Sequence, residues 1–133
     1  MSRITHFNPD SLPRPSGFSH ASAGLGEVVF TGGQISCDRS GKVVHAGDMA
    51  AQFGVAIANL RLALEAAGCA PDDVVKITYL VTDAAAYRAA LKPIGEHYRR
   101  IFGRTFPATT LIEVKGLFEP QALVEIEAVA VRS

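Results

Sequence analysis

The chain has 133 residues and no net charge, because 13 Lys and Arg side chains balance 13 Asp and Glu side chains. Hydrophobic residues make up 48% of the sequence, so a chain of this length can bury about two thirds of its unfolded surface in one core. We therefore expect a single domain over residues 1–133. A chain without excess positive charge lacks the surface that attracts phosphate groups, and nucleic acid is not an expected partner.

The sequence also bears on location, metals and cofactors. No stretch approaches the roughly 20 apolar residues that span a bilayer, and the first residues lack an apolar core of signal-peptide length. We expect a soluble, cytoplasmic protein without a membrane partner. Cys37 and Cys69 lie far apart, with no CxxC motif and no His at ligand spacing, so they predict two reduced thiols. No metal and no cofactor is predicted.

The first part of the chain predicts antiparallel strands. Residues Ile4–Phe7 read as a short strand, and the Pro- and Ser-rich stretch Pro9–Ser22 that follows predicts a loop. The β-branched and aromatic run Glu27–Thr31 predicts a second strand, which ends at a pair of glycines. After a turn around residues 38–41, the segment Lys42–His45 is expected to return as the hairpin partner of that strand.

The middle of the chain predicts a long helix and then a buried strand. Asp48 is a suitable N-cap and Gly68 a suitable C-terminal stop. Between them, apolar residues recur at steps of four, three and four: Phe53, Ile57, Leu60 and Leu64. In the run Val74–Thr82, both sets of alternating residues are of types common in strands, as expected for a central strand that is covered on two faces.

The second half completes an α+β domain. Pro93 is tolerated in the first turn of a helix and not in its interior, so we expect a short helix over Ala84–Ala90 and a second main helix over about Lys92–Phe102. Two further strands are expected within residues 106–114 and 123–131. This order of elements predicts a mixed sheet with the two main helices packed on one face.

The other face of the sheet is expected to need a cover. In the last strand, one set of alternating residues is apolar and faces the helices: Val124, Ile126, Ala128 and Ala130. On the preceding strand, alternation predicts Ile112 toward the helices, and Thr109 and Leu111 on the second face with Glu125. Because that second face ends in two valines, we expect another copy of the chain to bury it in a symmetric homo-oligomer.

Several segments, in order along nearly the whole chain, resemble the YjgF/RidA (Rid) superfamily. They are GFSHA at 17–21, VFTGGQI at 29–35, LEAAG at 64–68, FPATT at 106–110 and VEIEAVAV at 124–131. The resemblance implies a chorismate-mutase-like α+β fold, a homotrimer, and ligand clefts between neighbouring subunits. For the deaminating branch it also implies hydrolysis of reactive enamine or imine intermediates to a keto acid and ammonia. A small-molecule substrate is thus the expected partner.

The resemblance also implies roles for particular residues. Glu125 matches the family residue that positions the attacking water, and Phe18 matches an aromatic residue of the N-terminal loop. Thr109 stands where the deaminating branch has an Arg that binds the substrate carboxylate. A Thr hydroxyl offers one neutral donor in place of a charged fork, a difference of about 1 to 3 kcal/mol in binding. We therefore expect a substrate other than a simple 2-imino acid. Arg104 and Lys115 are displaced from the position of that Arg.

The candidate site combines a catalytic Glu125 with a set of substrate-binding residues. These are Phe18, Ser19, His20, Gly32, Gly33, Thr109 and Leu111. An imine carbon is already electrophilic, so the site mainly has to hold the substrate, orient a water and move protons. Backbone amides at the glycine pair would add donors. Ordinary explanations stay open, because a strand Glu is usually solvated, Thr is a common strand residue, and a glycine pair often ends a strand.

Three functions are compatible with these residues. The leading hypothesis is a Rid-type hydrolase that acts on a small enamine, imine or related reactive metabolite in a cleft between subunits. The alternative is a non-catalytic protein that binds a metabolite or a partner on the same trimeric scaffold. The third is a ribonuclease or translation inhibitor, which the zero net charge and the lack of a basic patch disfavour.

Overall fold

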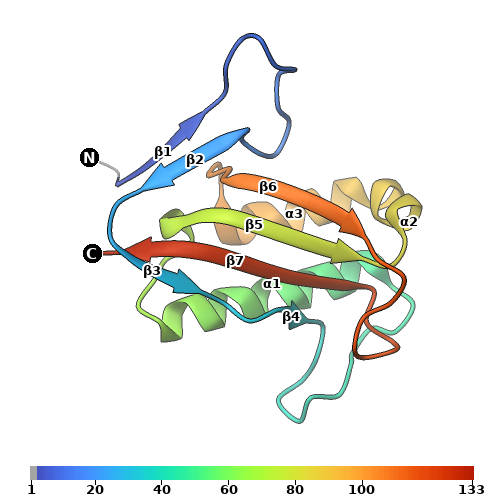
Figure 1. Cartoon of the computed structure of the whole chain (residues 1–133). Coiled ribbons are helices and arrows are strands. Elements are labelled where there is room, and N and C mark those ends of the chain that lie inside the picture. The colour runs from blue at the N-terminus through green and yellow to red at the C-terminus, as the bar shows by residue number, and fades with distance from the viewer. Residues whose placement is uncertain (1–2) are drawn as a thin grey trace.

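The computed structural model describes residues 3–133, and their main sheet has five strands (Figure 1). The strand order is β3 (Glu27–Phe30), β7 (Val124–Arg132), β5 (Val74–Val81) and β6 (Ala108–Glu113), with β4 (Gln34–Ile35) also paired to β7. β5 runs parallel to β6 and antiparallel to β7, and β7 is antiparallel to β3. The predicted α+β class with a mixed sheet is confirmed.

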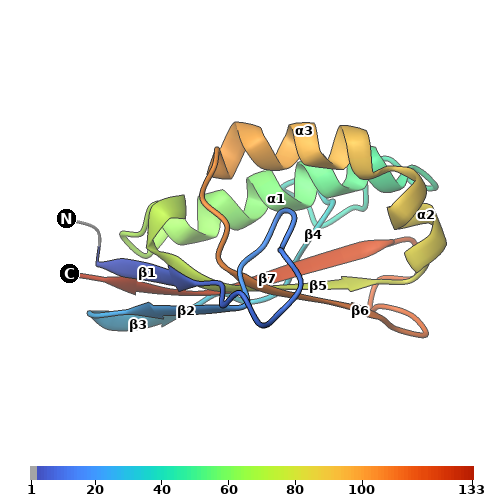
Figure 2. The same cartoon turned by 90° about the horizontal axis from the view of Figure 1, so that it is seen from above.

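Helices α1 (Met49–Ala66) and α3 (Leu91–Phe102) cover one face of this sheet, and the short α2 (Ala84–Ala89) leads into α3 (Figure 2). The Asp48 carboxylate caps α1 by accepting a hydrogen bond from a first-turn amide at 3.0 Å. The chain leaves α1 at Gly68, which has a φ of +77°. Both predicted main helices are confirmed. No helix within residues 3–133 is long and apolar enough to cross a membrane.

The core lies between these helices and the sheet. Its largest fully buried apolar side chains include Phe53, Ile57, Leu60, Leu64, Ile77 and Ile126. A polar side chain, Gln52, is completely buried beside them. Gln52 Nε2 donates to the carbonyls of His45 at 3.2 Å and Gln121 at 3.0 Å. Gln52 Oε1 accepts from the Leu123 amide at 2.8 Å. This residue therefore ties α1 to the loops that precede α1 and β7.

The N-terminal region differs in part from the prediction. The strand β1 (Ile4–Phe7) lies where expected, but it pairs with a strand that was not predicted, β2 (Ala21–Gly24). The predicted pairing of Lys42–His45 with the strand near residues 27–31 is wrong. That segment instead folds back along residues 36–38, where Val43 bridges Cys37, and β3 takes β7 as its partner. Local turn signals cannot reveal a partner that lies a hundred residues away.

The predicted faces of β6 are also wrong. In the parallel register of β5 and β6, Thr109 lies beside Ile77, and Leu111 lies beside Tyr79. Residues in register share a face of the sheet, and Ile77 and Tyr79 belong to the core on the helix side. Thr109 and Leu111 therefore face the helices, and Ile112 faces away from them. The error arises because β6 is an edge strand whose Thr-Thr-Leu-Ile sequence does not alternate clearly.

The sheet face away from the helices is covered in part by the chain itself. At the end of β7, Val131 is only 5% exposed, and a Cβ on Gly24 of β2 would lie 2.7 Å from its side chain. Farther along this face, Val28, Phe30 and Ile112 are exposed, with Phe30 reaching 74%. An apolar surface that the single chain leaves open is therefore present, although one of the two terminal valines is already buried.

Candidate functional site

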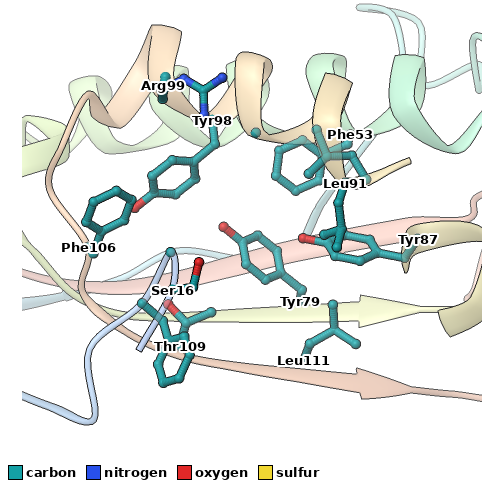
Figure 3. A pocket seen from close by; sticks show the side chains of 14 residues that line it. Ser16, Phe53, Tyr79, Tyr87, Leu91, Tyr98, Arg99, Phe106, Thr109 and Leu111 are labelled. Atoms are coloured by element: carbon teal, nitrogen blue, oxygen red, sulfur yellow. The ribbon is translucent and has the colours of Figure 1, made fainter. Parts of the chain in front are cut away.

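A pocket of about 720 Å³ lies between the sheet edge at β6 and helix α3 (Figure 3). Strands β5 and β6 form one wall, α2 and α3 form the opposite wall, and the N-terminal loop at residues 16–18 closes one side. Most of the lining is aromatic or aliphatic: Phe18, Phe53, Tyr79, Tyr87, Leu91, Ile94, Tyr98, Phe106 and Leu111. A hollow of this size and character fits a small organic molecule.

Aromatic rings from different elements build the walls of this pocket. Phe53 of α1, Tyr79 of β5 and Tyr87 of α2 have ring centroids 5.5, 6.1 and 6.3 Å apart. Toward the other end, Tyr98 of α3 stacks on Phe106 with the centroids 5.7 Å apart. Such pairs stabilise a fold by about 0.5 to 1.5 kcal/mol each beyond the burial of their surface. The pocket walls are therefore part of the packed structure.

Two tyrosine hydroxyls provide polar atoms inside this apolar pocket. The hydroxyls of Tyr79 and Tyr87 point into it, and neither has a hydrogen-bond partner among residues 3–133 (Figure 3). Burial raises the pKa of Tyr87 to about 12 and the pKa of Tyr79 well above its ordinary value of 10.0. Both phenols are therefore neutral at physiological pH, and each can donate a hydrogen bond to a ligand oxygen.

Thr109 and Leu111 line the pocket from β6, as a substrate-binding role requires. The Thr109 hydroxyl, however, donates its proton to the Pro107 carbonyl at 2.9 Å. A hydroxyl has one proton, so the remaining capacity of Thr109 is that of an acceptor. In this conformation Thr109 does not supply the neutral donor that the sequence leads us to expect, and a ligand carboxylate would need its donors from another residue.

The N-terminal loop brings Phe18 to the pocket, and its neighbours fix the loop. Phe18 lines the pocket and packs edge-to-face on the His20 ring, with centroids 5.3 Å apart. The His20 ring is hydrogen-bonded to the Pro13 carbonyl at 2.7 Å, and the Ser19 amide donates to the Pro107 carbonyl at 3.2 Å. Ser19 and His20 do not line the pocket of the single chain. They hold Phe18 beside the start of β6.

Glu125 lies on the opposite face of the sheet, away from this pocket. Its neighbours on β7, Val124 and Ile126, are buried in the core, so the alternation of a strand turns Glu125 to the other side. Gly33 lies directly against it, because a Cβ built on Gly33 would be 2.0 Å from Glu125 Oε2. The missing side chain at Gly33 makes room for the carboxylate. Gly32 is exposed, with no atom near the place that a Cβ would occupy.

The predicted site residues therefore form two groups within one chain. Phe18, Thr109 and Leu111 line the pocket on the helix side, whereas Gly33 and Glu125 meet on the open side. The expectation that alternation places the Thr hydroxyl and the Glu carboxylate on one face is wrong for a single chain. Within residues 3–133, no three His, Cys, Asp or Glu side chains are grouped so that they could hold a metal ion.

Five polar residues of the pocket were not among the predicted ones: Ser16, Tyr79, Tyr87, Tyr98 and Arg99. Tyr79 could not be singled out because both sets of alternating residues in its strand are of types common in strands. Tyr87 lies in a helix of six residues with no periodic pattern. Arg99 has a signal in the sequence. Leu91, Gly95 and Arg99 recur at a spacing of four, which puts them on one side of α3.

Comparisons with known proteins agree with the resemblance of the motifs. The family profile described as Endoribonuclease L-PSP matches residues 10–132. A 2-iminobutanoate/2-iminopropanoate deaminase of Salmonella typhimurium is 38% identical over 109 residues, which are 81% of this chain and 82% of that protein. The chain belongs to the YjgF/RidA family. A RutC family protein of Pyrococcus horikoshii, another relative, is 33% identical over 91% of this chain and 92% of its own length.

Solved structures of Rid proteins share the fold. The Rid family protein YyfB of Yersinia pestis, a protein of unknown function, superimposes with a TM-score of 0.84 at 34% identity, over 98% of this chain and 99% of that one. Escherichia coli TdcF with bound serine superimposes with a TM-score of 0.69 at 28% identity, over 90% and 91% of the two chains. The order of elements around the pocket is thus that of a Rid domain.

Proposed function

We propose that this Rid protein is a hydrolase that acts on a small reactive enamine or imine in a cleft between subunits. The observation that carries the proposal is the pocket at β6, where Phe18, Thr109 and Leu111 meet next to two tyrosine hydroxyls. The deaminase name of a relative with 38% identity and the serine bound to TdcF support a small substrate that carries an amino or imino nitrogen. Zero net charge gives no support to RNA as the substrate.

The proposal requires more than one chain, because Glu125 and the pocket lie on opposite faces of the same sheet. In a homotrimer, the open face of one subunit would bring its Glu125 and Gly33 to the β6 edge of the next. The exposed Phe30 and Ile112 support such a contact, since they are the apolar side chains that a neighbour would cover. We expect light scattering to give three times the chain mass at micromolar concentration; a monomer would contradict the proposed cleft.

The proposed chemistry is the addition of water to a C=N bond. An enamine first becomes an imine by taking a proton on its carbon while its nitrogen releases one. The Glu125 carboxylate accepts a proton from water while the water oxygen bonds to the imine carbon and the nitrogen takes up a proton. The resulting carbinolamine loses ammonia as its C–N bond breaks and the C=O bond forms. The sum is imine plus water to carbonyl compound plus ammonia, and no redox partner is needed.

A coupled assay tests the activity. A serine dehydratase generates 2-aminoacrylate, and the decay of this enamine to pyruvate and ammonia is followed with and without the protein. We expect modest acceleration by the wild type. Thr109→Arg is expected to raise it about 10-fold to 100-fold, because a guanidinium provides a charged fork for the carboxylate.

Matched variants make the assay informative. Thr109→Gln introduces a longer side chain without the charge at the same position of β6, and it serves as the control. If neither the wild type nor Thr109→Arg accelerates the decay, the hydrolase is rejected for this substrate. Thermal stabilisation by a keto acid without turnover would then identify the non-catalytic, metabolite-binding alternative.

A further inference from the structure

Arg99 places a positive charge at the rim of the pocket. Among the described residues that line the pocket, it is the only charged one, and it has no ion pair or side-chain hydrogen bond within residues 3–133 (Figure 3). Arg99 extends from α3, the wall opposite Thr109. An unpaired guanidinium beside an apolar hollow is a fork of donors with no acceptor in the protein, and carboxylates fit that fork in bidentate geometry.

The helix is built so that this guanidinium has room. One turn before Arg99, a Cβ on Gly95 would lie 3.2 Å from Arg99 Nη1. Glycine weakens the interior of a helix relative to alanine, so its presence in the second turn of α3 is unfavourable for the helix itself. Here the missing side chain leaves space at the pocket wall beside the Arg99 guanidinium. Gly95 and Arg99 thus lie side by side in the lining of the pocket.

The size of the pocket indicates the rest of the ligand. A cavity of about 150 Å³ is enough to hold benzene. The pocket, at about 720 Å³, is therefore several times larger than a three-carbon imino acid needs. The rings of Phe53 and Tyr79 are almost fully buried, and the accessible apolar lining comes from Phe18, Tyr87, Leu91 and Leu111, against which another flat group can pack. This surface favours an aromatic or similarly flat apolar substituent.

We infer that the substrate is an organic anion with a carboxylate at one end and a planar apolar group at the other, and that Arg99 binds the carboxylate. The inference rests on the proposed function, in that it takes the same pocket as the substrate site. It also agrees with the engaged proton of Thr109, because the positive charge that binds the carboxylate belongs to Arg99 of α3 and not to a residue of β6. The ligand then lies across the pocket, with its flat group against Tyr87 and Leu111.

Binding measurements with three probes test this inference. Phenylpyruvate carries both features, pyruvate lacks the phenyl group, and phenylacetone has a methyl group in place of the carboxylate. By titration calorimetry, the wild type is expected to bind phenylpyruvate more tightly than either of the others. Arg99→Gln is expected to weaken phenylpyruvate binding about 10-fold or more and to leave phenylacetone binding unchanged.

Arg100→Gln is the matched control, because Arg100 is the next residue of α3, contacts the His97 ring at 3.1 Å and does not line the pocket. It should bind all three probes like the wild type. The inference is overturned if the two variants bind phenylpyruvate equally, if Arg99→Gln weakens phenylacetone to the same extent, or if the wild type does not bind phenylpyruvate. These measurements report binding and not turnover. Failure of the coupled assay therefore leaves the role of Arg99 in binding untouched, and failure of the Arg99 measurements leaves the proposed hydrolysis untouched.

Discussion

Glu125→Gln is expected to slow imine hydrolysis by at least about 100-fold, because a positioned general base contributes two to four orders of magnitude and an amide cannot accept the proton from water. The free energy of unfolding should change by less than about 0.5 kcal/mol, since Glu125 is half-exposed and makes no side-chain hydrogen bond within residues 3–133. The rate is measured in the coupled assay and the stability by urea unfolding.

Glu127→Gln is the control for this variant, because Glu127 lies two residues along β7 on the same face and is exposed. It should retain the wild-type rate. Gly33→Ala tests the position of the Glu125 carboxylate, since the Cβ of the alanine would overlap that carboxylate and force it to move. We expect this variant to lose rate as well while keeping the Glu. Full activity in Glu125→Gln would remove Glu125 from the mechanism.

Gln52→Leu is expected to lower the free energy of unfolding by about 3 kcal/mol, the largest stability effect that we foresee for a substitution of similar size. The substitution keeps the volume of the side chain but removes its three hydrogen bonds to the backbone at His45, Gln121 and Leu123. Leu123 carries the chain into β7, so its amide is then left without an acceptor at the edge of the core.

Urea unfolding followed by circular dichroism measures this effect. Gln121→Leu is the control, because the Gln121 side chain is exposed and its backbone carbonyl is retained, so the expected change is within about 0.5 kcal/mol. A loss below about 1 kcal/mol in Gln52→Leu would mean that water takes over the three hydrogen bonds. The buried amide would then contribute specificity of loop position and little stability.

The helices and most strands could be predicted from the sequence because their signals are local. Asp48 and Gly68 mark the two ends of α1, and the apolar steps between them follow the period of a helix. The pairing of strands is not local. β3 pairs with β7 across about a hundred residues, and the nearby Lys42–His45 segment offered a plausible but incorrect partner.

The candidate site could be predicted only residue by residue and not as an arrangement. Family motifs identified Phe18, Thr109 and Glu125, but the direction of Thr109 follows from its register with Ile77, which no local pattern on an edge strand reveals. The sequence also gives no indication that the Thr109 hydroxyl donates its proton to the Pro107 carbonyl. Arg99 has no counterpart among the motifs, and its position becomes meaningful only with Gly95 and the pocket beside it.

The location of Glu125 and of the pocket on opposite faces of one sheet has a consequence for how such proteins diversify. The residues that line the pocket come from α1, α2, α3, β5, β6 and the N-terminal loop, whereas the proposed proton acceptor lies on β7 beside Gly33. Substitutions that reshape recognition therefore leave the acid–base group undisturbed in its own chain. In the proposed cleft, where the pocket of one copy meets Glu125 of another, ligand choice and reactivity would therefore vary independently.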